Sequence, residues 1–138
     1  AIKIYTKAIE INPKYEYTYY CRGFSYWRSK QYKKAINDYN KAIEINPECA
    51  MAYSDRGNVY FELKQYKKAI NNYNKAIKID PECAMAYSDR GNLHFELKQY
   101  KKAINDWEKA ISLRSLGCSA ITELRKKIKA LKAKTKKH

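Results

Sequence analysis

An all-α fold of stacked antiparallel helix pairs is predicted by three features of this 138-residue sequence. Residues 50–83 are nearly repeated by the next 34 residues, with 23 of 34 positions identical, and residues 16–49 share 21 of 34 positions with them. Apolar and aromatic residues recur at steps of three and four, which is the spacing of one helix face. An Asx-Pro pair interrupts this pattern every 34 residues. A fixed period of this length is typical of a solenoid, in which each unit buries a face against its neighbour.

The opening segment, residues 1–15, corresponds to the second half of a unit, because it aligns with the residues that start at Ala35. We expect a single helix here, left from a truncated preceding unit. Its apolar stripe, formed by Ile2, Tyr5, Ala8 and Ile9, would lie uncovered on one side. Self-association through this edge is therefore predicted.

Each of the three full units, residues 16–49, 50–83 and 84–117, predicts two helices joined by a short turn. Small residues on the facing stripes, such as Gly57 and Ala69, permit close approach of the two helices. The second helices are expected to end at the Asx-Pro pairs, because a residue before proline is pushed out of the helical region and proline has no amide hydrogen. These pairs are Asn12-Pro13, Asn46-Pro47 and Asp80-Pro81.

The last segment, residues 118–138, changes pattern. Ile121, Leu124, Ile128 and Leu131 form one narrow apolar stripe among basic residues. We expect a helix that caps the last unit, because a solenoid would otherwise expose its terminal face to water. A basic amphipathic helix can also bind membrane surfaces or calmodulin-like partners, although this one lacks an aromatic anchor.

Composition limits the kind of protein. Lys and Arg outnumber Asp and Glu by 29 to 14, and the resulting charge of +15 favours acidic partners or anionic surfaces. The cysteines show no CxxC spacing, so no disulfide framework is expected. No apolar run is long enough to span a membrane and no leader opens the chain, which together predict a cytoplasmic or otherwise intracellular protein.

Aromatic, glycine and alanine residues occupy equivalent places in the three units. They are Tyr19, Gly23, Tyr26, Ala35, Tyr39 and Ala42, then Tyr53, Gly57, Tyr60, Ala69, Tyr73 and Ala76, then Tyr87, Gly91, His94, Ala103, Trp107 and Ala110. Over residues 1–117 this pattern resembles the tetratricopeptide repeat (TPR) family. The resemblance implies a right-handed superhelical solenoid of antiparallel helix pairs, with three full repeats, half of a preceding repeat and a C-terminal capping helix. It also implies a scaffold that binds a peptide or partner segment in a concave groove.

Two rows of residues depart from the family pattern. Arginine (Arg22, Arg56 and Arg90) stands where leucine is usual, and lysine (Lys30, Lys64 and Lys98) stands where the turn glycine is usual. Neither change is expected to break the fold. We expect each arginine stem to pack while its charged head stays in water.

The resemblance implies that the first helix of each repeat lines the groove. The residues at these places are Tyr17, Tyr20, Cys21, Phe24, Trp27 and Arg28, then Met51, Ser54, Asp55, Asn58, Phe61 and Glu62, then Met85, Ser88, Asp89, Asn92, Phe95 and Glu96. All the groove places differ between the first and middle repeats, whereas only three of the last 20 positions differ. Ligand recognition and chance divergence at an end repeat both account for this.

We hypothesise that the four aromatic residues of the first repeat anchor a peptide, while Asn58 and Asn92 bond its backbone. The family also captures acidic chaperone C-termini with a clamp of lysines, arginine and asparagines. Here Tyr20, Met85 and Asp89 occupy the cationic places of that clamp. An acidic tail is therefore disfavoured, and a peptide with a basic or amphipathic end fits better.

The alternative function is a basic module that binds nucleic acid or another polyanion. Lysines recur on the second helices, and more follow in the tail, residues 132–138. Phosphate contacts need only such charge, but no base-reading motif accompanies it. The recurring lysines are Lys33, Lys34, Lys67, Lys68, Lys101 and Lys102.

Catalysis and metal binding are not expected. His94 replaces a packing tyrosine, and no nucleophile with a nearby base is evident. Asp55 and Asp89 recur at one position, but no apolar pocket that would raise a carboxyl pKa is apparent. Repeating cysteines lie a full repeat apart, too far for one zinc ion, and no glycine-rich phosphate loop occurs, so neither metal nor cofactor is predicted.

Overall fold

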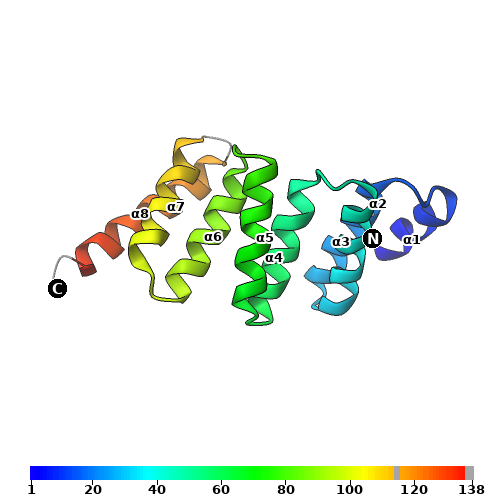
Figure 1. The fold of residues 1–138 in the computed structure, drawn as a ribbon, viewed down its shortest axis with the longest axis horizontal. Helices are drawn as coiled ribbons and strands as arrows, with labels where there is room; N and C mark the ends of the chain where they lie inside the picture. The colour runs from blue at the N-terminus through cyan, green and yellow to red at the C-terminus, as the bar shows by residue number, and fades with distance from the viewer. Residues whose placement is uncertain (114–115, 136–138) are drawn as a thin grey trace. The chain divides into compact units, whose positions relative to one another are not determined.

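The fold was analysed in a computed structural model that describes residues 1–113 and 116–135. Within these residues the chain forms eight α-helices and no β-strand, so the predicted all-α class is confirmed (Figure 1). The helices fall into two compact units, unit 1 (Ala1–Ile79) and unit 2 (Asp80–His138).

Unit 1 contains one single helix and two antiparallel helix pairs. Its elements are α1 (Ile2–Ile11), α2 (Glu16–Arg28), α3 (Tyr32–Ile45), α4 (Ala50–Glu62) and α5 (Tyr66–Ile79). Helix α2 packs on α3 and α4 packs on α5, while α1 packs on α2 and α3 packs on α4. Helices α2 and α4 also touch. The predicted helix ends are confirmed, because α1 and α3 stop before Asn12 and Asn46, whose backbones are extended as proline requires.

Unit 2 contains one helix pair and the C-terminal helix, α6 (Ala84–Glu96), α7 (Tyr100–Ser112) and α8 (Cys118–Thr135). The predicted capping helix is confirmed, because Leu124, Ile128 and Leu131 of α8 are buried against α7. Their partners on α7 include Trp107, whose side chain is fully buried.

Glycine allows the two helices of each pair to approach closely. A Cβ atom at Gly57 would lie 2.8 Å from the Tyr73 ring, and one at Gly91 would lie 2.5 Å from the Trp107 ring. Such distances are shorter than any real carbon contact, so the ring occupies the space that a side chain would need. The predicted role of these small residues in helix packing is confirmed.

The turn inside each helix pair holds a lysine in the left-handed backbone conformation. Lys30, Lys64 and Lys98 have φ of 62°, 60° and 61°. In the first turn, the Lys30 amide donates to Trp27 and the Gln31 amide donates to Tyr26, which satisfies the last carbonyls of α2. A residue with a Cβ atom accepts this conformation at a cost of about 1 kcal/mol, so the fold tolerates these lysines at a cost to its stability.

The apolar edge of α1 differs from the expectation. The stripe formed by Ile2, Tyr5, Ala8 and Ile9 is half-buried, and Ile9 packs against the core around Tyr19. The largest apolar exposures on α1 are instead at Ile4 (71%) and Ile11 (80%). Helix α2 covers the predicted stripe in part, because α1 packs on it directly.

None of the described helices is both long enough and apolar enough to cross a membrane.

Candidate functional site

The sequence-predicted groove residues lie on three helices. In unit 1, α2 and α4 carry them, and in unit 2, α6 carries them. All of them are exposed or half-buried except Ser54, of which only 3% is accessible. Ser54 is therefore too buried to contact a partner. The exposed residues are Tyr17, Phe24, Arg28, Met51 and Glu62 in unit 1, and Met85, Phe95 and Glu96 in unit 2. The half-buried residues are Tyr20, Trp27, Asp55, Asn58 and Phe61 in unit 1, and Ser88, Asp89 and Asn92 in unit 2.

A row of aromatic rings runs along α2. Tyr17, Tyr20, Phe24 and Trp27 are three or four residues apart and so share one helix face. The rings of Tyr17 and Tyr20 stack with centroids 6.1 Å apart, and Phe24 meets Trp27 edge-on at 5.5 Å. Tyr17 is 56% exposed and Phe24 is 39% exposed. These two rings are therefore available to a partner, whereas Tyr20 and Trp27 also pack in the core around Tyr39.

A hollow of about 220 Å³ lies between α1 and α2 in unit 1. Its walls are mostly aromatic, with one cysteine and one serine. The lining residues are Tyr5, Tyr17, Tyr20, Cys21, Phe24 and Ser25. The hollow is large enough for one side chain, and sequence reasoning missed it because Tyr5 comes from a different helix.

The Tyr20 ring connects this hollow to a half-buried carboxylate. The Tyr20 hydroxyl donates a hydrogen bond to Oδ2 of Asp55 on α4. Burial raises the pKa of Asp55 to about 6, and the bond from Tyr20 partly offsets that rise. Burial also raises the pKa of Tyr20, and the Asp55 charge adds to the increase. The expectation that nothing here raises a carboxyl pKa is wrong, because the packing around Asp55 buries it in part.

Asn58 and Asn92 have roles inside the fold. The Tyr73 hydroxyl donates to Asn58 Oδ1 at 2.6 Å, and the Trp107 indole N–H donates to Asn92 Oδ1 at 3.1 Å. Each asparagine carbonyl oxygen therefore satisfies the polar atom of a buried ring. Bonding of a peptide backbone by the rest of each side-chain amide stays a prediction.

The first repeat lacks this bond. Phe24 stands where the other two repeats have Asn58 and Asn92, and Tyr39 stands where they have Tyr73 and Trp107. The Tyr39 hydroxyl is buried and has no hydrogen-bond partner among the described residues. The first repeat has thus exchanged an internal hydrogen bond for an exposed aromatic ring.

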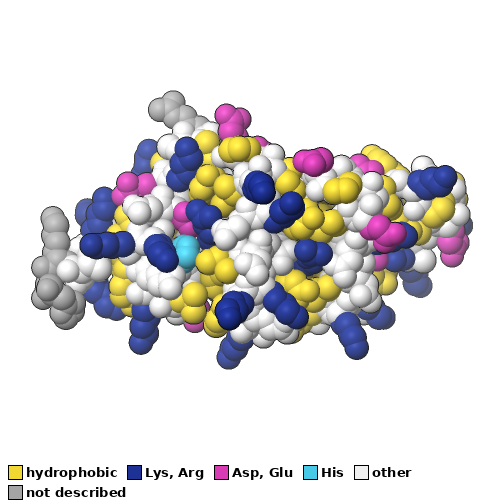
Figure 2. All heavy atoms as spheres, in the orientation of Figure 1, with side chains coloured by type: hydrophobic (Ala, Val, Ile, Leu, Met, Phe, Trp, Pro, Cys, Tyr) yellow, Lys and Arg dark blue, Asp and Glu magenta, His cyan; other side chains and the backbone are white. Residues whose placement is uncertain are grey.

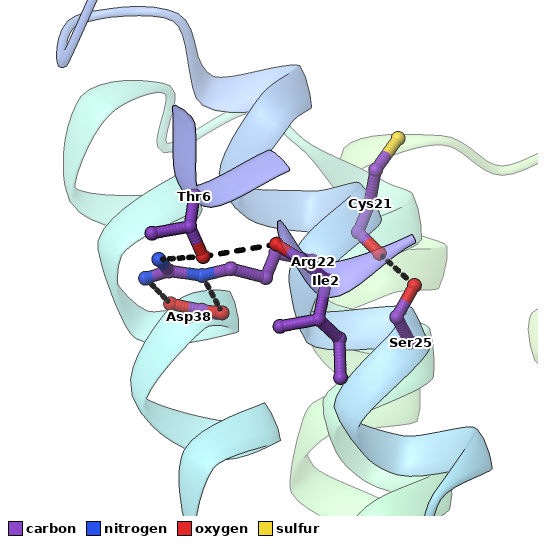
Figure 3. Close-up of polar contacts among 6 residues, drawn as sticks. All are labelled: Ile2, Thr6, Cys21, Arg22, Ser25 and Asp38. Atoms are coloured by element: carbon purple, nitrogen blue, oxygen red, sulfur yellow. Dashed lines mark hydrogen bonds and ion pairs between the residues drawn. The ribbon is translucent and has the colours of Figure 1, made fainter. Parts of the chain in front are cut away.

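The arginine row is paired within the fold, which corrects the expectation of solvated heads. Arg22 makes a two-pronged ion pair with Asp38 on α3, with both N–O distances 2.8 Å, and only 19% of its side chain is exposed (Figure 3). Arg90 binds Asp106 on α7 in the same way at 2.8 and 2.7 Å. The hydrogen bonds to these aspartates raise the pKa of both arginines. The shared spacing of 16 residues was the sequence signal that could have revealed the pairs.

Arg56 occupies the same place in the middle repeat but meets no carboxylate within the described part of the chain. Its Nε donates to Asn72 Oδ1 at 2.8 Å and its Nη1 donates to Asn40 Oδ1 at 2.7 Å. Burial lowers the pKa of this arginine. The middle repeat therefore holds a half-buried cation whose hydrogen-bond partners are amide oxygens.

His94 is buried in unit 2, as predicted for a residue that replaces a packing tyrosine. Its Nδ1 lies 2.7 Å from Gln99 Oε1, and its Nε2 lies 3.6 Å from the Asp106 carboxylate that binds Arg90. The side chain is therefore part of the polar packing between α6 and α7.

Basic side chains, Lys and Arg together, show no concentration at one place on the visible face. Figure 2 shows dark blue side chains dispersed over both units. Lys34 and Lys68 lie over the rings of Tyr26 and Tyr60, at 5.6 and 5.4 Å from the ring centroids. Some of the recurring lysines thus pack on the surfaces of their own helix pairs. Residues 136–138 of the tail lie outside the described residues.

Family models match most of the repeated region. A model described as tetratricopeptide repeat matches residues 16–49 and 84–115, and a model described as TPR repeat matches residues 57–98. The chain belongs to the tetratricopeptide repeat family. The resemblance seen in the sequence is thereby confirmed. No curated protein sequence matches this TPR chain.

Solved TPR structures resemble the chain. The first TPR of Spaghetti (RPAP3), bound to the HSP90 peptide SRMEEVD, is 29% identical, with 84% of this chain and 92% of that chain covered and a TM-score of 0.72. The Arabidopsis OM64 TPR domain is also 29% identical, covering 83% of this chain and 94% of its own, with a TM-score of 0.74. MamA is similar in fold, with 24% identity, 99% and 87% coverage and a TM-score of 0.74.

Proposed function

We propose that this TPR protein is an interaction scaffold that binds a peptide or partner segment on the exposed faces of α2 and α4. The exposed α6 residues of unit 2 are proposed as a second contact surface. The observation that carries the proposal is the pair of exposed rings, Tyr17 and Phe24, beside an aromatic hollow on a TPR fold. Large exposed aromatic groups of this kind usually anchor protein partners.

The chemistry of the surface argues against an acidic tail as the ligand. The neighbour bound to SRMEEVD holds a peptide that ends in acidic residues. Here the places that the family's clamp fills with cations hold Tyr20, Met85 and Asp89. Asp55 adds a half-buried carboxylate to the same face. A partner with apolar and basic side chains complements this surface better.

We propose no enzymatic, metal-dependent or cofactor-dependent activity. The titratable groups Asp55, Arg22 and His94 each contact a polar side chain of the same unit. The family match supports peptide recognition and gives no support to the nucleic-acid alternative.

The test is selection of peptides by the full chain from a displayed random library, followed by affinity measurements on variants. Replacing Tyr17 and Phe24 together with serine removes the exposed rings and spares the core residues Tyr20 and Trp27. We expect a loss of binding of at least tenfold with unchanged helicity. The matched control replaces Lys33 of α3 and Lys67 of α5 with serine, and it should leave affinity unchanged.

The opposite pattern would overturn the proposal. If the lysine variant loses binding and the aromatic variant keeps it, the binding surface lies on α3 and α5. A steep fall in affinity with added salt would then favour a polyanion partner.

Self-association through α1 stays a separate prediction. Lysine at both Ile4 and Ile11 should convert any dimer to monomer in sedimentation if this edge forms the contact. A dimer that survives both changes would place the contact elsewhere.

A further inference from the structure

We propose that the aromatic hollow and Asp55 of unit 1 together form a socket for one arginine side chain of the bound partner. In this arrangement the guanidinium donates to the Asp55 carboxylate, and the stem lies on the rings of Tyr17, Tyr20 and Phe24. The inference rests on the proposed function and adds the chemical class of the ligand's anchor residue. The hollow is lined by residues of α1 and α2, and Asp55 lies on α4. Tyr20 connects the two, because its ring lines the hollow and its hydroxyl donates to the Asp55 carboxylate.

Asp55 differs from the other aspartates that lie within helix pairs. Asp38 and Asp106 each hold an arginine in a two-pronged ion pair. Asp55 instead accepts a hydrogen bond from the neutral Tyr20 hydroxyl through Oδ2, and no cation pairs with it in the described residues. A partly buried carboxylate without a counter-charge is unfavourable, and a partner cation would relieve that cost.

The nearest cation by sequence is turned away. Arg56 follows Asp55 on α4, but successive helix residues do not face each other. Its guanidinium bonds to Asn72 on α5 and Asn40 on α3. The Asp55 carboxylate lies on the α2 side of the helix, where it accepts the hydrogen bond from Tyr20. Burial raises the pKa of Tyr39 and of Cys49, and the Asp55 charge adds to both increases. This side of α4 therefore carries negative charge although the whole chain is basic.

Tyrosine rings already hold arginine in this protein. The guanidinium of Arg56 lies 5.2 Å from the Tyr53 ring centroid, that of Arg90 lies 5.4 Å from Tyr87, and that of Arg22 lies 5.8 Å from Tyr26. Each is also bonded to an acceptor on the next helix. The socket presents the same two elements, an aromatic surface and an oxygen acceptor, to a side chain from outside.

Arginine fits this socket better than lysine. Its guanidinium is planar, stacks on rings and is less strongly hydrated than an ammonium group. A carboxylate whose second oxygen is already engaged by Tyr20 can still accept from a guanidinium N–H. The long-range repulsion from the net charge of +15 is screened beyond about 8 Å at physiological salt.

The test uses three acetylated, amidated pentapeptides of sequence Ala-Leu-X-Leu-Ala, in which X is arginine, citrulline or lysine. Citrulline has the shape of arginine without its charge. Binding to the full chain is followed by amide chemical shifts at about pH 7.5, above the pKa of Asp55, where its carboxyl is ionised. We expect the arginine peptide to bind at least tenfold more tightly than the citrulline peptide, with lysine between them, and to shift resonances of α2 and α4.

Two variants separate the charge of Asp55 from charge in general. Asp55→Asn keeps an acceptor for Tyr20 and should abolish the preference for arginine over citrulline. Glu44→Gln removes one exposed carboxylate from α3 and should leave the preference unchanged. Circular dichroism of both variants confirms that the fold is retained.

Equal affinities for the arginine and citrulline peptides would overturn the socket, as would a preference that survives Asp55→Asn. Absence of binding by all three peptides would overturn it as well. These outcomes leave the proposed function standing, because that proposal is judged by library-selected peptides and by the Tyr17 and Phe24 replacements. Unchanged affinity of the Tyr17 and Phe24 variant for the selected peptides would overturn the scaffold surface itself.

Discussion

One of the differences between the first repeat and the other two changes the internal hydrogen bonding of the helix pair. Phe24 cannot accept a hydrogen bond, whereas Asn58 and Asn92 accept one from the ring beneath them. The Tyr39 hydroxyl therefore lies buried without a partner in the region that the structure describes. An unsatisfied buried hydroxyl costs stability that a satisfied one does not, so removal of the hydroxyl should have opposite effects in the two repeats.

We expect Tyr39→Phe to be neutral or to raise the free energy of unfolding by about 1 kcal/mol, and Tyr73→Phe to lower it by about 1 kcal/mol. Urea unfolding monitored by circular dichroism measures both values. In a Phe24→Asn background the hydroxyl gains an acceptor, and Tyr39→Phe should then become unfavourable. A clear loss of stability for Tyr39→Phe in the natural sequence would contradict this reasoning.

Arg56 provides a second test at the scale of one residue. Asn72 stands where Asp38 and Asp106 pair with their arginines. Asn72→Asp should complete the missing ion pair and raise the free energy of unfolding by about 1 kcal/mol at neutral pH. The gain stays modest because Asn72 also donates to the Lys68 carbonyl at 2.7 Å, and aspartate cannot. Denaturant unfolding measures it, and lower stability of the variant would show that desolvation of the new charge dominates.

At the scale of helices, the same elements recur with small differences that set their stability. Each pair uses a left-handed lysine in its turn, and each second helix that precedes an Asx-Pro pair stops there. Because the strain lies in the backbone of one residue, replacing that residue with glycine relieves it directly.

We expect Lys64→Gly to raise the free energy of unfolding by about 0.5 to 1 kcal/mol. The same replacement at Lys75, in the interior of α5, should lower it by about 1 kcal/mol because glycine disfavours helix. Thermal unfolding of both variants gives the comparison. Destabilisation by Lys64→Gly would indicate that the lysine side chain makes a compensating contact.

Helix α8 stabilises unit 2 through three buried side chains. Leu124→Ala should cost about 2 to 4 kcal/mol because it leaves a cavity against α7. Lys126→Ala, on the exposed side of α8, should change stability by less than about 0.5 kcal/mol. Hydrogen exchange of the α7 amides reports the difference. Equal effects would mean that α8 does not stabilise α7.

The helix arrangement could be predicted because its signals are local and repeated. The step of three and four residues, the Asx-Pro pairs and the final apolar stripe each act within one helix or turn, and each was placed correctly. The partners of Arg22, Asn58 and Asp55 were missed because each lies on a different helix. Burial of Asp55 depends on how α2 packs on α4, which the sequence pattern does not specify.

At the scale of the molecule, the Asp55 carboxyl makes the stability of the fold depend on pH. The pKa of Asp55 is about 6 in the fold, compared with an ordinary value of 3.8. The folded state therefore binds this proton more tightly than the unfolded state. The contribution of Asp55 to stability is greatest below pH 4 and is lost as the pH rises through 6.

We expect Asp55→Asn to be more stable than the natural protein at pH 7.5, by a difference on the order of 2 to 3 kcal/mol. The difference should shrink steadily as the pH falls toward 4, because the natural carboxyl is then also neutral. Urea unfolding of both proteins across this range measures it. A difference that does not change with pH would contradict the assignment to this proton.

Each unit contains one tryptophan, so the fluorescence of each tryptophan reports on one unit. Trp27 is half-exposed beside Phe24 in unit 1, and Trp107 is enclosed between α6 and α8 in unit 2. Leaving only one indole, by Trp27→Phe or Trp107→Phe, would give a fluorescence signal that belongs to one unit. A ligand that covers the α2 rings should then shift the emission maximum of Trp27. The emission of Trp107 should stay unchanged.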